Sequence, residues 1–193
     1  MHNGIVENFA AIRRDLMAQG YVFASETDTE TIAHLIDHTL KSTPDLFDAV
    51  RIATGQLVGA YAIAVVKEGE PRAVLARHGA QLLLGIAADG HYAASDASAL
   101  LPVTRTMVYL EDGDIAEIRR DGYRITRHDG SVPLRPSHES SLSDDAVELG
   151  QYRHYMQKEI FEQPQALANT LEMIGSAQAL SPNLFGAAAP EMF

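Results

Sequence analysis

The chain has 193 residues, no cysteine and a formal net charge of −11 at neutral pH. Without cysteine, these residues form no disulfide, thiolate nucleophile or thiolate metal site. The acidic balance argues against a nucleic-acid partner, because phosphate binding requires clustered Lys and Arg. No apolar run reaches the roughly 18 residues of a membrane span, and the chain does not begin with a basic segment or an apolar signal core. We expect a cytoplasmic protein of one domain, or of one domain and a piece of another.

Helical patterns dominate the first 55 residues. Apolar side chains recur at helical spacing from Ile5 to Leu16, and Gly20 stands where a helix would stop. We therefore predict a helix over 5–19, followed by a short strand over 21–24.

Two further helices are predicted before residue 56. Thr27 and Glu30 form a capping box that opens the first of them, with an inward face of Ile32, Leu35, Ile36 and Leu40. The Ser-Thr-Pro run at 42–44 predicts the start of the next. Its buried face would consist of Leu46, Phe47, Val50 and Leu57.

After Gly55 the apolar period becomes that of strands. Short β-type runs separated by turn signals predict strands over 58–66, 73–77, 82–87, 91–94, 107–110, 114–119 and 123–128. They should form an antiparallel meander, interrupted by one or two helical turns over 95–101.

The remainder changes character again. Residues 131–150 carry few large apolar groups and are predicted to be a surface loop or linker. A helical pattern begins at 152 and continues past Pro164, which should kink or restart the helix. Residues 181–193 are small and apolar without a stop signal, so the chain is expected to be cut rather than finished.

Two short stretches could carry chemistry. Asn3 and Gly4 place an amide side chain beside an unhindered backbone N–H, and two such donors at a strand-to-helix corner can stabilise an oxyanion. Asp28 is expected in the first turn of a helix, where the dipole keeps a carboxylate ionised and able to receive an ammonium group. Taken alone, Asn-Gly is more often a turn, and an acid at this position is more often an ordinary helix-start residue.

A metal site is a weaker alternative. His34 and His38 lie four residues apart on a predicted helix, with Glu30 one turn earlier, so three potential ligands share a face. Their apolar neighbours explain both histidines as half-buried or solvated side chains, and no further ligand is evident. We expect neither a metal nor a cofactor.

Several stretches together resemble the glutamine-fructose-6-phosphate aminotransferases, which belong to the class II glutamine amidotransferases. They are HNGIVEN at 2–8, SETDTE at 25–30, the central runs 94–104 and 110–118, and YRHYMQKEIFEQP at 152–164. The last string looks like the family's junction between glutaminase and sugar-isomerase domains. Other class II amidotransferases share the front motifs but not this tail, so a purine-pathway or asparagine-forming relative is a distant alternative.

The resemblance implies a fold and a site. The fold would be α+β: a partial α-β-β-α sandwich, N-terminal nucleophile hydrolase-like, with antiparallel sheets and a C-terminal helical segment. Residues 1–150 would be the distal part of the glutaminase domain, and 151–193 the interdomain linker and the start of the sugar isomerase domain. The Asn3 side chain and the Gly4 N–H would be the oxyanion donors. Gly4 and Asp28 would bind substrate, with the Asp28 carboxylate holding the α-ammonium of glutamine.

The implied function is hydrolysis of glutamine to supply ammonia for glucosamine 6-phosphate synthesis. In this family the attacking thiolate is the first residue of the mature chain, and the arginine that binds the glutamine carboxylate lies in the same upstream portion. The isolated chain should therefore be inactive and should bind L-glutamine weakly or not at all. Fructose 6-phosphate would bind only in the missing domain beyond Phe193.

Two expectations concern assembly. The resemblance implies that the family's first strands are missing, which should expose sheet edges and apolar faces, so we expect the chain to self-associate as a homo-oligomer. A noncatalytic binding or assembly module that retains the scaffold is the alternative to a piece of an enzyme.

Overall fold

The computed structural model describes residues 1–140 and 149–175. The chain divides into two compact units, residues 1–146 and residues 147–193. Each unit is described by itself.

The segment 5–19, which the sequence predicts as one helix, contains the end of a strand followed by a helix. β1 runs over His2–Val6 and α1 over Phe9–Ala18, so the prediction of a helix beginning at residue 5 is wrong. Ile5 pairs with Ala60 of β2, and its side chain is 70% exposed. Strand pairing satisfies the backbone here, and it outweighs the helical spacing of one apolar side chain.

The segment 21–24 is also not a strand. Its rings pack on α2, which spans Asp28–Leu40. The ring centroids of Phe23 and His34 are 4.6 Å apart, and those of Tyr21 and His34 are 5.1 Å apart. The alternating apolar residues of this segment therefore pack on a helix instead of pairing with a strand.

The helix starts are set by side-chain caps. The Thr27 hydroxyl accepts the Glu30 N–H at 3.3 Å, which confirms the predicted cap of α2. α3 spans Leu46–Thr54, and its cap is Asp45 instead of the Ser-Thr-Pro run at 42–44. Leu57, expected on the buried face of this helix, lies beyond its end but packs against the same core cluster.

The strands form two antiparallel sheets. The first sheet has the order β1-β2-β3-β7-β8 and the second has the order β5-β4-β6-β9. Beside β1, the first sheet contains β2 (Gly59–Val66), β3 (Ala73–His78), β7 (Asp114–Ile118) and β8 (Tyr123–Arg127). The second contains β4 (Leu83–Ala87), β5 (Gly90–Ala94), β6 (Thr106–Tyr109) and β9 (Ser137–Glu139).

The connectivity differs from a simple meander. The chain leaves the first sheet after β3, builds β4 to β6 with a single 3-10 turn at Ala97–Ala99, and returns as β7. β9 lies in the segment predicted as a loop. Its three residues, Ser-His-Glu, are polar and exposed, so no alternation of apolar and polar residues marks it as a strand.

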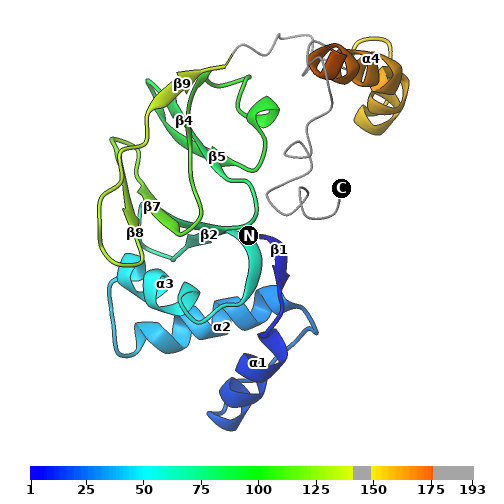
Figure 1. Cartoon of the computed structure of the whole chain (residues 1–193). Coiled ribbons are helices and arrows are strands. Elements are labelled where there is room, and N and C mark those ends of the chain that lie inside the picture. The colour runs from blue at the N-terminus through cyan, green and yellow to red at the C-terminus, as the bar shows by residue number, and fades with distance from the viewer. Residues whose placement is uncertain (141–148, 176–193) are drawn as a thin grey trace. The chain divides into compact units, whose positions relative to one another are not determined.

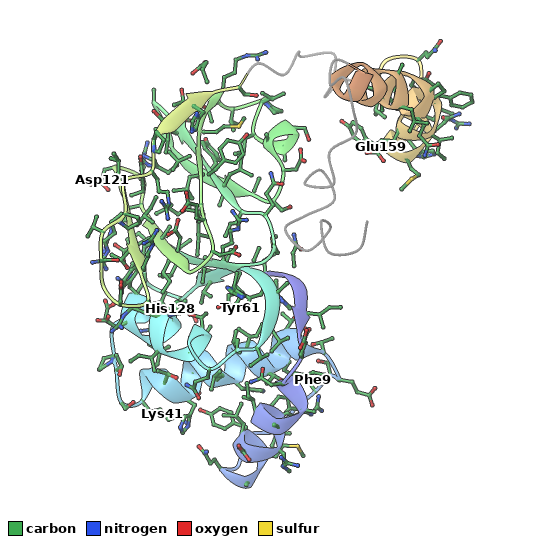
Figure 2. All side chains as sticks on the ribbon, viewed as in Figure 1. Phe9, Lys41, Tyr61, Asp121, His128 and Glu159 are labelled. Atoms are coloured by element: carbon green, nitrogen blue, oxygen red, sulfur yellow. The ribbon has the colours of Figure 1, made fainter. Side chains whose placement is uncertain are left out.

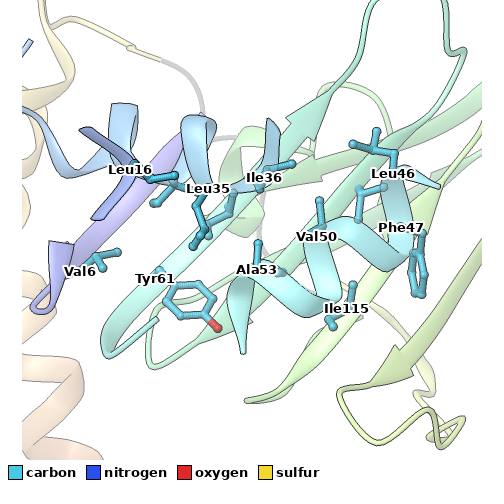
Figure 3. Close-up of a cluster of buried hydrophobic side chains, with 14 residues drawn as sticks. Val6, Leu16, Leu35, Ile36, Leu46, Phe47, Val50, Ala53, Tyr61 and Ile115 are labelled. Atoms are coloured by element: carbon cyan, nitrogen blue, oxygen red, sulfur yellow. The ribbon is translucent and has the colours of Figure 1, made fainter. Parts of the chain in front are cut away.

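Alternation along the first sheet builds two cores. Helices α1 to α3 cover one face and the second sheet covers the other (Figure 1). Ile63, Ala76 and Ile115 belong to the helix-side cluster, whereas their neighbours Ala62, Leu75 and Ala116 belong to the cluster between the sheets. Figure 3 shows the helix-side cluster, in which Ala53 of α3 lies between Tyr61 and Val50. The predicted α+β class with antiparallel sheets is confirmed.

The second unit contains α4, Tyr155–Gly175. This helix begins three residues later than predicted and continues through Pro164 without restarting. The expectation for residues 181–193 lies outside the described residues. Within the described parts of both units, no helix is long and apolar enough to cross a membrane.

Candidate functional site

The predicted oxyanion donors lie inside β1. Asn3 pairs with Ala62 of β2, and Gly4 pairs with Tyr61 of the same strand. Tyr61 lies beside the helices (Figure 2). The expected strand-to-helix corner follows several residues later, at Asn8. The Asn8 amide donates to the Gln56 carbonyl at 2.8 Å and accepts the Val58 N–H at 3.0 Å. The sequence did not predict that the Asn8 side chain holds the turn between β1 and α1 in place.

Gly4 must be glycine for a structural reason. Its φ is +122°, and a Cβ built at this position would lie 2.1 Å from the Ala60 carbonyl oxygen. Gly59 on β2 has a φ of +117°, and its Cβ would lie 2.3 Å from the Ile5 carbonyl oxygen. Any side chain at either position would force the two strands apart.

Asp28 bridges the first helical turn of α2 and the strand β1. Its Oδ2 accepts the Val6 N–H at 3.0 Å, and its Oδ1 lies 3.6 Å from His2 Nδ1. The carboxylate stands at the amino end of the helix, where the dipole favours negative charge. The predicted helix-start position of Asp28 is confirmed, and the contact with β1 brings it close to the strand that carries Asn3 and Gly4.

The His2 side chain is buried where β1 meets the first turn of α2, a region that we call the β1–α2 corner and that comprises His2, Val6, Asp28 and Thr29. The His2 side chain is 3% exposed, and its Nδ1 lies 3.1 Å from the Thr29 hydroxyl oxygen. Among the described residues its Nε2 has no hydrogen-bond partner. Burial lowers the pKa of His2, the nearby Asp28 carboxylate opposes that shift, and the terminal amine adds to it. These contacts of His2 could not be predicted from the sequence, because a lone histidine beside Asn-Gly belongs to no spacing motif.

Glu30 holds the segment that precedes Asp28. Its carboxylate accepts the Ser25 hydroxyl at 2.5 Å, the Ser25 N–H at 2.6 Å and the Ala24 N–H at 2.7 Å. These hydrogen bonds, that of the Ser25 hydroxyl first, lower the pKa of Glu30 to about 2. Glu30 therefore anchors the loop that leads into the candidate substrate-binding residue.

The same glutamate belongs to the metal alternative. His34 Nε2 lies 3.5 Å from Glu30 Oε1, and its ring packs on Phe23. Among the residues that the structure describes, no group of three or more His, Asp or Glu side chains is placed to hold a metal ion.

The Asn3 side chain and the Asp28 carboxylate are on opposite sides of β1. His2 pairs with Ile63 of the helix-side cluster, whereas Asn3 pairs with Ala62 of the inter-sheet cluster. Adjacent strand residues point to opposite faces, so the Asn3 side chain points away from the face on which Asp28 contacts His2. β1 is an edge strand of its sheet. The two faces of the sheet therefore meet at the unpaired edge of β1.

A cavity of about 300 Å³ lies beside this corner on the helix side. Its walls include His2, Thr29, Ile32 and Val65, and they do not include Asn3, Gly4 or Asp28. None of the three predicted site residues therefore lines this cavity.

Comparison with protein families places the chain in a known class. A family model described as "Glutamine amidotransferase domain" matches residues 1–102, and the chain belongs to this family. The glutamine-fructose-6-phosphate aminotransferase of Acidithiobacillus ferridurans is 56% identical over the whole chain, and the enzyme of that name from Xylella fastidiosa strain 9a5c is 50% identical over the whole chain. The chain spans about a third of each relative, 32% of its length.

Solved structures agree with the fold. A glutamine phosphoribosylpyrophosphate amidotransferase from B. subtilis superposes with a TM-score of 0.57 at 28% identity. The match covers 68% of this chain and 29% of that one.

Proposed function

We propose that this chain is the distal part of the glutaminase domain of a glutamine-fructose-6-phosphate aminotransferase, which hydrolyses glutamine to supply ammonia for glucosamine 6-phosphate synthesis. The observation that carries the proposal is identity of 46–56% to enzymes of that name over the whole chain. The amidotransferase structure from B. subtilis that matches by fold shares only 28% identity with this chain, which favours the aminotransferase over the phosphoribosylpyrophosphate enzyme.

The proposed site lies across the free edge of β1. The Asn3 amide and the Gly4 N–H stabilise the oxyanion of the tetrahedral intermediate, and the Asp28 carboxylate binds the α-ammonium of glutamine. These groups come from the edge strand and from the helix end that contacts it. An amino acid lying over a strand edge can contact groups on both faces of the strand, which accommodates the different orientations of Asn3 and Asp28.

The remaining proposals concern parts and partners. Residues 151–193 are the interdomain linker and the start of the sugar isomerase domain, and fructose 6-phosphate binds in that further domain. The chain as it stands contains no cysteine, so it has no thiol to attack the glutamine amide. It binds L-glutamine weakly at most and has no glutaminase activity of its own.

A chimera tests this function. The portion of the Acidithiobacillus ferridurans enzyme that precedes the matched region is joined to Met1, and ammonia release from glutamine is measured. We expect release from the chimera and none from the present chain. A chimera that folds but stays inactive, or repurified native chain that releases ammonia, would contradict the proposal.

Variants of the chimera test the residue roles. Asn3→Ala should lower kcat by about 10²- to 10³-fold, because one oxyanion donor is lost. Asp28→Asn should act mainly by raising KM for glutamine. Gln56→Ala removes an exposed amide at the surface, and Asp15→Asn neutralises an exposed acid on α1. These two controls should leave both constants near the parental values.

A further inference from the structure

The β1–α2 corner contains a histidine that the proposed chemistry does not use. We propose that His2 is a positioning residue for Asp28: its imidazole, protonated at Nδ1, joins β1 to the first turn of α2 and thereby fixes the carboxylate that meets the substrate ammonium. The inference rests on the proposed role of Asp28. It assigns His2 no contact with substrate.

The contacts place the ring between two elements. His2 Nδ1 lies 3.1 Å from Thr29 Oγ1, a hydrogen-bond distance, and 3.6 Å from Asp28 Oδ1, which is an electrostatic contact and too long for a hydrogen bond. The other carboxylate oxygen of Asp28 accepts the Val6 N–H from the same strand. Two residues at opposite ends of β1 thus hold the two oxygens of one carboxylate.

The chemistry of these neighbours selects the tautomer. A carboxylate only accepts hydrogen bonds, so a bare Nδ1 would point its lone pair towards the negative charge of Asp28. With the proton on Nδ1, the ring donates to the Thr29 hydroxyl and presents a positive dipole to Asp28. Nε2 then carries the lone pair, and it is the atom that is buried without a partner among the described residues.

The surroundings favour a neutral ring. The His2 side chain is only 3% exposed. This burial lowers the pKa of the imidazole, and the terminal amine of Met1 lowers it further. Asp28 opposes the shift without reversing it. The further charged side chains on the walls of the adjoining cavity are Asp37 and Lys67, which are opposite in sign. A neutral Nδ1–H ring leaves the full charge of Asp28 available for an ammonium group.

The tautomer is measured on the native chain. Long-range ¹H–¹⁵N correlation spectra of the histidine rings at pH 7 should show His2 protonated at Nδ1 and bare at Nε2. Protonation at Nε2 alone, or at both nitrogens, would overturn the inference. This measurement needs no variant, so a variant that fails to fold does not prevent a decision.

Two substitutions separate positioning from packing. His2→Asn retains an N–H donor near the place of Nδ1 and loses most of the ring, whereas His2→Phe retains the ring and loses the donor. The Val6 amide reports on Asp28, because it donates to that carboxylate. We expect its hydrogen exchange in His2→Phe to be about three- to tenfold faster than in the parent, and near the parental rate in His2→Asn.

The reverse pattern would overturn the proposal. If His2 acts only by filling space, His2→Phe keeps the Val6 amide protected and His2→Asn exposes it. His138→Phe, a change at an exposed histidine on β9, is the matched control and should leave Val6 exchange unchanged.

The outcome is independent of the proposed function. If Asp28→Asn in the chimera leaves KM for glutamine unchanged, the substrate role of Asp28 fails. The tautomer and the Val6 exchange still decide whether His2 fixes the carboxylate.

Discussion

Two groups of polar side chains at the first sheet differ in how fully their hydrogen-bonding capacity is used. On the β7 side, the carboxylates are saturated with arginine. Arg135 donates through Nε to Asp114 Oδ2 at 2.7 Å and through Nη2 to Oδ1 at 2.9 Å, and Asp114 is fully buried. Glu117, 4% exposed, accepts from Arg72 at 2.6 Å and from Arg119 at 2.9 Å.

At the β1–α2 corner the polar groups are only partly used. Asp28 accepts one backbone N–H, and the described residues offer His2 Nε2 no partner. On the β7 side, burial raises the pKa of Glu117, but hydrogen bonds from Arg119 and Arg72 outweigh it and hold the pKa below its ordinary value. A saturated carboxylate stabilises the fold, whereas unused hydrogen-bonding capacity indicates a binding site. We therefore expect that removing an arginine partner on the β7 side lowers stability, whereas removing the Asp28 carboxylate acts mainly on the proposed substrate binding.

The largest stability effect is expected from Arg135→Ala. It leaves the buried Asp114 carboxylate without its bidentate partner, which should lower the free energy of unfolding by about 3 kcal/mol. Chemical denaturation followed by circular dichroism measures the loss. Arg127→Ala is the control, because this half-exposed arginine has a longer contact, 3.8 Å, with the exposed Glu111. Equal effects of the two variants would contradict the comparison.

Gly4→Ala should come next. The added Cβ meets the Ala60 carbonyl oxygen at a φ of +122°, so we expect a loss of about 2 kcal/mol from strain and overlap together. Gly20→Ala separates the two causes, because its φ is +91° and nothing lies within 4 Å of the added atom. Denaturation curves that show Gly20→Ala to be as damaging as Gly4→Ala would remove the close approach of the strands as a cause.

Thr27→Ala should cost about 1 kcal/mol, because it removes the hydroxyl that caps α2. The measurement is again the free energy of unfolding. Thr27→Ser retains the cap and should lie near the parent. If both variants lose the same stability, the capping hydroxyl is not the cause.

The smallest effect is a change in pH dependence at Glu30. Its pKa falls from 4.5 to about 2 on folding, so between these values the unfolded chain binds more protons and stability rises with pH. The contribution is complete above pH 4.5 and is lost as the pH falls towards 2. Glu30→Gln should flatten this slope, and Ser25→Ala should reduce it, because the Ser25 hydroxyl is the largest cause of the shift.

The matched control is Glu26→Gln, which makes the same change of charge on an exposed side chain of the same loop. Unfolding free energies measured across pH 2 to 5 should show the parental slope for this control. A parental slope in Glu30→Gln would contradict the assignment to Glu30.

Much of the fold could be predicted from the sequence because its determinants are local. The cap at Thr27 and the apolar faces of α2 and α3 need only neighbouring residues, and the alternation from residue 58 onward predicts the strands. The errors arose where a distant partner decides. Ile5 joins a strand because Ala60 pairs with it, and residues 21–24 fail to form a strand because they pack on α2. The homo-oligomer stays a prediction.

The residues of the candidate site came from motifs, and the role of each stays a proposal. The sequence alone was enough to predict the family and most helices and strands between residues 28 and 128, because helical period, strand alternation, turn chemistry and long motifs are written in consecutive residues. Three facts became visible only in the folded chain: the strands divide between two sheets, the Asn3 side chain points away from the face of β1 on which Asp28 contacts His2, and the His2 side chain is buried against Thr29. Those facts depend on which backbone groups meet across the fold, and pairing of groups that are far apart in the chain leaves no local pattern.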